Sequence, residues 1–131
     1  MNERPHVFTE SHLSKDSFKA DGLRPYAEYR DLGLAKSTHG MVQGHVIRHA
    51  PGTTPEQRKS AGHYHEVQFQ MVYVLKGWIK TEFEGQGVKE FRAGSCWTQP
   101  SGIRHKVLEM SEDMELLEII MPAEFATVDT E

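Results

Sequence analysis

Short β-prone segments separated by turn residues constrain this chain most strongly. Between Pro25 and Pro122, segments rich in Val, Ile, Tyr, Phe, Trp and Thr are interrupted by Gly or Asp at roughly 8–12-residue intervals, which is typical of an all-β sandwich or barrel. No segment shows the long 3.6-residue periodicity of an amphipathic helix. Gly85 and Gly87 predict a hairpin, because glycines readily adopt the positive φ angles of tight turns.

The 131 residues of the chain are the length of a single domain. We expect a polar N-terminal arm over residues 1–24, a β-barrel over residues 25–122 and a C-terminal tail over residues 123–131. The last barrel segment, residues 114–122, is apolar on both faces and is therefore expected to be a buried strand that ends at Pro122.

Composition argues against several classes of protein. The chain has no run of about 18 apolar residues that could cross a membrane, and its polar first residues lack the apolar core of a signal peptide. The net charge of −4, without a basic patch, argues against binding to nucleic acid. The single cysteine, Cys96, fits a reducing compartment. We therefore expect a cytoplasmic protein. We also expect Cys96 to be a small buried hydrophobic residue, as free cysteines usually are.

Two of the eight histidines are distinguished by their spacing. His63 and His65 are two positions apart in an extended segment, so both imidazoles project from one face of the sheet, close enough to share a metal ion. Neutral imidazole is a common ligand of divalent transition metals. His45 could line a pocket, although a role other than metal binding is expected for it. Three further histidines lie in arm or turn sequence and are expected at the surface: His6, His12 and His39.

The segments HYHEVQFQMVYVLKG, at 63–77, and GSCWTQPSGIRHKVLE, at 94–109, resemble the two motifs of the cupin superfamily. The first motif matches at His63, His65 and Gly77, and the second matches at four positions: Gly94, Pro100, Gly102 and His105. The resemblance implies a double-stranded β-helix, or jelly-roll, barrel. It also implies one divalent transition metal (Fe, Mn, Zn, Ni or Co) held by His63, His65 and His105. A homodimer is expected, both from the resemblance and because the arm is long enough to cover an open sheet edge of a partner.

The acidic ligand position of the first motif is occupied by Gln70, which we include in the predicted metal site. Its amide oxygen can bind a metal but brings no charge. Gln70 is an odd number of residues from His65, so in an unbroken strand the two side chains would point to opposite faces. A shared site requires a bulge or bend near residues 66–68. In a straight strand, Val67 and Phe69 would face the histidines instead.

Two functions from different classes remain open. One is a metal-dependent enzyme of the dioxygenase, isomerase or lyase type that acts on a small anionic organic molecule. The other is a non-catalytic module that binds or senses a small molecule and has a structural or vestigial metal site. No carboxylate stands out as a general base. Trp97 is expected in the core rather than in the pocket, and Arg48 and Arg104 are expected to be solvated or ion-paired.

Overall fold

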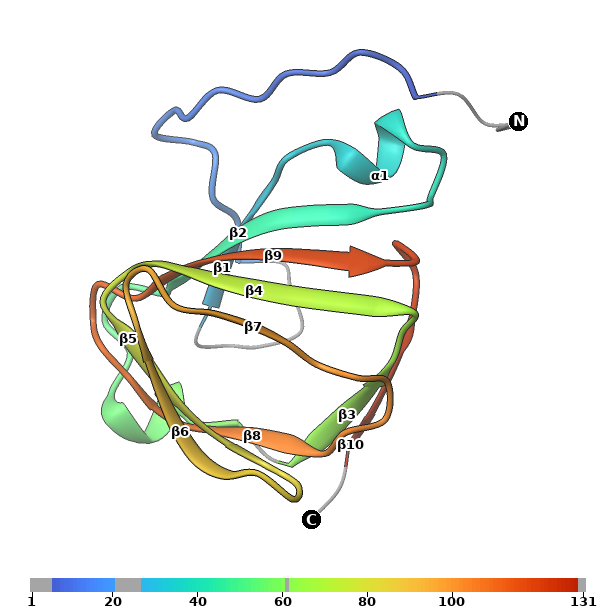
Figure 1. Ribbon diagram of the computed structural model, residues 1–131. Coiled ribbons are helices and arrows are strands. Elements are labelled where there is room, and N and C mark those ends of the chain that lie inside the picture. Colours follow the sequence, from blue (N-terminus) through green and yellow to red (C-terminus); the bar gives the residue numbers. More distant parts are fainter. Residues whose placement is uncertain (1–5, 21–26, 61, 130–131) are drawn as a thin grey trace.

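The computed structural model describes residues 6–20, 27–60 and 62–129. Figure 1 shows two layers of antiparallel strands facing each other, as expected for the all-β jelly-roll barrel predicted from the sequence. Ten strands are described: β1 (Ala27–Asp31), β2 (Gln43–His49), β3 (His63–Glu66), β4 (Phe69–Lys76), β5 (Trp78–Phe83), β6 (Gly87–Arg92), β7 (Cys96–Thr98), β8 (His105–Met110), β9 (Glu115–Met121) and β10 (Ala126–Asp129). Two short helical turns complete the elements: α1 (Leu34–Ser37) and the 3-10 turn η1 (Pro55–Arg58).

The chain alternates between the two sheets as it proceeds. One sheet has the strand order β1-β2-β9-β4-β7, and the other has the order β10-β3-β8-β5-β6. Consecutive strands β3 and β4 therefore lie in different sheets, as do β4 and β5, β6 and β7, and β8 and β9. Repeated crossing is what closes two sheets into one barrel, because each crossing places neighbouring sequence on opposite walls of the same interior.

Strand alternation divides the residues of β4 as the sequence predicts. Gln70, Val72 and Val74 are buried on the inner face, whereas Tyr73 and Leu75 are exposed on the outer face. The hairpin between β5 and β6 also forms as predicted, with positive φ angles at its two glycines. No helix among the described residues is long and apolar enough to cross a membrane.

The expectation for Cys96 is wrong, because its side chain is exposed. Cys96 lies on β7, a three-residue strand at the edge of its sheet. Alternation turns the neighbouring Trp97 inward, where its ring stacks on Phe91 with centroids 4.1 Å apart. Cys96 consequently faces outward, on the same side as exposed Thr98.

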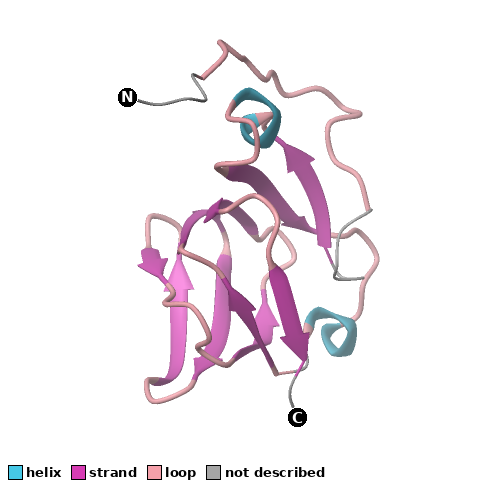
Figure 2. Ribbon diagram, turned by 90° about the vertical axis from the view of Figure 1, so that its right-hand side faces the viewer, coloured by secondary structure: helices cyan, strands magenta, loops and turns pink. Residues whose placement is uncertain are grey.

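Both ends of the chain interact with the barrel. Within the arm, Lys19 pairs with Tyr29 through two backbone hydrogen bonds, and the guanidinium of Arg48 lies 3.9 Å from the centre of the Phe18 ring. Figure 2 shows the arm extended along the outside of the barrel beside α1, where the Val7 N–H donates to the Ser37 carbonyl. Residues 123–131, expected to be a tail, contain β10, which pairs with β3. The expected boundary between residues 24 and 25 lies outside the described residues.

Gly77, the last residue of the first motif, occupies the tight crossing between β4 and β5. Its φ is +66°, and an added Cβ would lie 2.5 Å from Asp113 Oδ1 and closer still to Ser111 Oγ. Ser111 Oγ is itself held in place because it accepts a hydrogen bond from the Trp78 N–H. Both the backbone angle and the space at this position therefore require glycine.

We expect Gly77→Ala to lower the free energy of unfolding by about 3 kcal/mol, since backbone strain and steric overlap add at this position. Gly94→Ala is the matched control, because Gly94 also has a positive φ but has nothing within 4 Å of an added Cβ. The control should lose only about 1 kcal/mol. Guanidinium unfolding measures both values, and equal losses would show that the contact with Ser111 imposes no constraint.

Candidate metal centre and cavity

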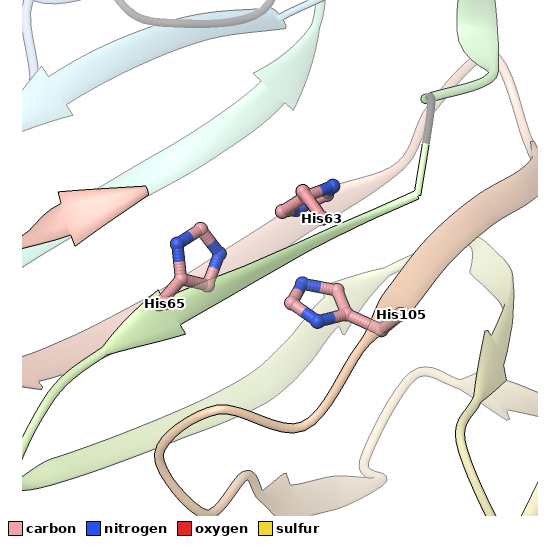
Figure 3. Close-up of side chains that lie close together, drawn as sticks. All are labelled: His63, His65 and His105. Atoms are coloured by element: carbon pink, nitrogen blue, oxygen red, sulfur yellow. The ribbon is translucent and has the colours of Figure 1, made fainter. Parts of the chain in front are cut away.

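Three histidines converge on the inner wall of the barrel. Their ligand nitrogens lie within 4.8 Å of one another, and Figure 3 shows His63 and His65 on β3 and His105 on β8 pointing toward a common point. The centres of the imidazole rings are 4.1 Å apart for His63 and His105, 4.9 Å for His63 and His65, and 5.0 Å for His65 and His105. This spacing suits three nitrogens bound to one ion.

Local structure explains the convergence. His63 and His65 share the inner face of β3 because they are two residues apart, and His63 is directly opposite His105 across the β3–β8 pair. The turn before β8 is held by the Gly102 N–H, which donates to the His65 carbonyl at 2.9 Å. Gly102 has a φ of +82°. The second-motif turn is therefore attached directly to the strand that carries the first two histidines.

Two of these imidazole rings have a hydrogen-bond partner at their Nδ1 atom. His105 Nδ1 donates to the Ile103 carbonyl at 3.1 Å, which leaves Nε2 unprotonated in the neutral ring and able to bind a cation. His65 Nδ1 lies 2.9 Å from the hydroxyl of Thr127 on β10. Such contacts fix the orientation of an imidazole ligand. Strand β10, which the sequence analysis did not predict, thus contributes to the site.

The pKa of His105 is lowered to about 4, mainly by burial and next by the nearby imidazole of His63, with a smaller contribution from His65. The hydrogen bond with Ile103 and the charge of Glu118 oppose this shift only in part. His105 is therefore neutral at neutral pH. A neutral imidazole offers its lone pair to a metal without first losing a proton, so the site is prepared for a cation.

Gln70 lines the same cavity as the histidines. The bend that this requires is present, because β3 ends at Glu66, the chain crosses to the other sheet at Val67 and Gln68, and β4 begins at Phe69. The crossing is held by the Gln68 N–H, which donates to the Met121 carbonyl at 2.7 Å. Gln70 is consequently buried on the inner face of the sheet that faces the histidines.

Glu118, which the sequence analysis did not select, is the carboxylate of this site. It lies on the inner face of β9 and accepts hydrogen bonds from Gln70 Nε2 at 2.7 Å and from His45 Nε2 at 2.6 Å. Burial by itself would raise the pKa of Glu118, but the hydrogen bonds from His45 and Gln70 and the charge of His45 outweigh it and hold the pKa below its usual range. Glu118 is therefore ionised at neutral pH.

A signal for Glu118 was present in the sequence. Leu116, Glu118 and Ile120 share one parity of strand β9, so the acidic residue between two apolar ones on that face points into the barrel interior. His45, for which the sequence left a place in the pocket open, lines the cavity and contacts Glu118. Among the remaining histidines, His6, His12 and His39 are exposed as expected.

The residues present fit a metal ion. Because the amide nitrogen of Gln70 donates to Glu118, its Oε1 is the atom left to bind another group. That oxygen is buried and accepts no hydrogen bond from any residue that the structure describes. A buried polar atom without a partner is costly, and a cation beside the three imidazoles would satisfy it.

The cavity between the sheets has a volume of about 650 Å³ and extends well beyond the histidines. Trp97 both lines it and packs against the core. Arg48 and Arg104 are ion-paired, as expected, with Glu28 at 2.9 Å and with Glu84 at 3.1 Å. The structure thus brings together the three histidines, Gln70, Glu118 and His45 within one cavity and leaves both arginines outside it.

Comparison with solved structures shows the same fold in enzymes. The polyketide cyclase RemF from Streptomyces resistomycificus superposes with a TM-score of 0.74 at 16% identity, covering 95% of this chain and 87% of that one. KdgF from Halomonas sp. gives a TM-score of 0.64 at 16% identity, with 87% and 96% covered. Oxalate decarboxylase from Bacillus subtilis gives 0.63 at 17% identity, but this chain covers only 34% of its length.

Sequence comparison identifies the family. No curated protein sequence matches the chain significantly, whereas residues 48–120 match the family described as the Cupin domain. That segment contains both motifs, the three converging histidines, Gln70 and Glu118. Because it spans more than half of the 131 residues, the chain belongs to the cupin family.

Proposed function

We propose that this protein is a metal-dependent enzyme that moves a proton on a small organic molecule, as an isomerase or a lyase does. The observation that carries the proposal is the cluster of His63, His65 and His105 in the same cavity as Gln70, whose Oε1 has no partner among the described residues. These four residues would hold one divalent transition metal. Imidazole and amide ligands are compatible with Fe, Mn, Zn, Ni or Co.

When bound, a divalent cation supplies Lewis acidity that polarises a carbonyl oxygen of the substrate. Glu118 supplies the complementary group, since it is ionised and lies in the same cavity. A C–H bond next to the carbonyl breaks, its proton passes to the carboxylate of Glu118, and its electron pair moves toward the polarised oxygen. Return of the proton to the same carbon or to a neighbouring one completes an exchange or an isomerisation.

His45 and Gln70 position this carboxylate. Each donates a hydrogen bond to a different oxygen of Glu118, so the carboxylate cannot rotate freely. A carboxylate oxygen has more than one lone pair, and both oxygens therefore retain capacity to accept a proton from a substrate. Fixed orientation of a proton acceptor is a main requirement for general base catalysis.

The metal site can be tested without a known substrate. We expect His63→Ala/His65→Ala to lose bound metal while retaining the barrel, because the hydrophobic core cluster contains neither histidine. The measurement is elemental analysis of untagged protein, with circular dichroism to verify the fold. The control is His12→Ala/His39→Ala, which removes two exposed imidazoles. Equal metal content in both double variants would refute the assignment.

Proton transfer can be tested by deuterium exchange. Metal-loaded protein in D₂O should accelerate exchange next to the carbonyl in members of a panel of enolisable ketones, and Glu118→Gln should lower that rate by about 10²-fold or more, as expected for loss of a general base. Glu115→Gln is the control on the same strand, where Glu115 pairs with Lys76 outside the cavity. Nuclear magnetic resonance measures the exchange at saturating metal.

Absence of exchange across the ketone panel would favour the alternative of a non-catalytic binding module. Exchange that survives in Glu118→Gln would assign the proton acceptor elsewhere.

We also propose that the protein is a homodimer. The outer face of β4 exposes 41% of Phe69, 39% of Tyr73 and 40% of Leu75, and the arm exposes 85% of Phe8. Within one chain these apolar surfaces lie on different elements and remain open to solvent. Exposed apolar side chains gathered on one face of a strand, as on β4, are typical of a protein interface.

Light scattering should give a mass of twice 14.9 kDa. We expect Tyr73→Glu/Leu75→Glu to halve that mass, since two buried charges would destabilise an apolar interface. Val88→Glu is the control, because Val88 is exposed on the hairpin strand β6. A wild-type mass near 14.9 kDa at micromolar concentration would contradict the proposal.

A further inference from the structure

The cavity is polar at one end and apolar at the other. Strand register orders its lining: Phe83 is paired with His105 at the level of the histidines, Thr81 is paired with Val107 one inward step farther along, and Ile79 is paired with Met110 beyond that. The facing sheet follows the same order, from Gln70 through Val72 to Val74 along β4. The apolar end is lined by Ile79, Val107, Met110, Met114 and Leu116.

One polar atom interrupts this apolar end. Thr81 lines the cavity and is 2% exposed. Its Oγ1 is buried and has no hydrogen-bond partner among the residues that the structure describes. An unpaired buried hydroxyl destabilises a folded protein, so its presence on a cavity wall indicates that a ligand satisfies it.

The two unpartnered polar atoms are separated along the cavity. Thr81 is two residues from Phe83 on β5, which places it about 7 Å along the strand from the level of His105. Gln70, on the facing sheet, lines the same cavity as the histidines. A ligand that extends from the histidine end to Thr81 therefore carries an oxygen group at each end of a rigid body about as long as two fused rings.

The interior of the cavity carries little fixed charge. Apart from histidines, the charged side chains lining the described part of the cavity are three carboxylates and one ammonium group: Asp16, Asp31, Glu118 and Lys19. Asp16, Asp31 and Lys19 are exposed, which leaves Glu118 as the charged carboxylate of the interior. A small dianion would occupy only the histidine end and would leave the apolar end unfilled.

We propose, building on the proposed function, that the substrate is a neutral, largely apolar ring compound with oxygen groups at both ends, one facing the histidines and Gln70 and the other bonded to Thr81. The sequence predicted an anionic substrate, whereas the lining of the cavity favours a neutral one. Burial of the ring against the apolar end supplies most of the affinity, and Thr81 supplies selectivity for the second oxygen.

Binding of 2,6-dihydroxynaphthalene, 2-naphthol and oxalate to the full chain tests this by calorimetry. We expect the diol to bind about five- to tenfold more tightly than 2-naphthol, as one additional satisfied hydrogen bond predicts, and we expect oxalate not to compete. Both ring compounds should still bind after the metal is removed with a chelator, since neither Thr81 nor the apolar end requires it. Competition by oxalate, or no binding of the diol, would overturn the proposal.

Two variants assign the effect to residues. Thr81→Val keeps the shape of the side chain but removes the hydroxyl, so it should abolish the preference for the diol. The affinity for 2-naphthol should change by less than about threefold. The free energy of unfolding should not fall, because the buried hydroxyl has no partner to lose. Val107→Phe should weaken both ring compounds at least about tenfold by filling the apolar end. The matched controls are Thr98→Val and Val88→Phe, at exposed positions. A preference for the diol that persists in Thr81→Val would refute the role of this hydroxyl.

This test is independent of the proposed function. If the protein holds no metal and exchanges no deuterium but still prefers the diol through Thr81, the proposed enzyme fails and the ligand class stands. If metal and exchange are present but the ring compounds do not bind, the ligand class fails and the enzyme stands.

Discussion

The change of sheet at Val67 and Gln68 determines which side chains meet inside this barrel. It places His63 and His65 on one wall and Gln70 on the wall that faces them. The backbone hydrogen bond from Gln68 to Met121 holds this crossing against the end of β9, the strand that also carries Glu118. One short segment thus sets the position of the imidazoles relative to both the amide and the carboxylate.

In this arrangement the proposed metal ligands and the negatively charged carboxylate are different residues. A carboxylate at position 70 would bring its charge directly to a metal held there, whereas here position 70 is an amide that donates a hydrogen bond to Glu118. The proposed ligand set is neutral, and the negative charge lies on Glu118, which is held by His45 and Gln70. A bound cation would therefore keep more of its Lewis acidity, and the carboxylate would stay available to a substrate.

The all-β class and the His63–His65 pair could be predicted from the sequence because both depend on local patterns, whereas the jelly-roll barrel and the inclusion of His105 came from the resemblance to the two cupin motifs. Turn glycines, strand alternation and the spacing of His63 and His65 are set by backbone geometry within a few residues. Glu118 could not be assigned a role in this way, since its function depends on the pairing of β9 with β2 and β4, which joins residues far apart in sequence. Cys96 was mispredicted for a related reason: its exposure depends on β7 being an edge strand, which only the strand order reveals.

The arm has a consequence for how the cavity can change over evolution. Asp16, Ser17 and Lys19 contribute to the cavity lining, yet apart from the pairing of Lys19 with Tyr29 they belong to no strand of the barrel. Substitutions and short insertions there alter the mouth of the cavity without disturbing strand register or the histidines. The lining contributed by the N-terminal segment can therefore vary among related chains while the barrel and its histidine cluster stay unchanged.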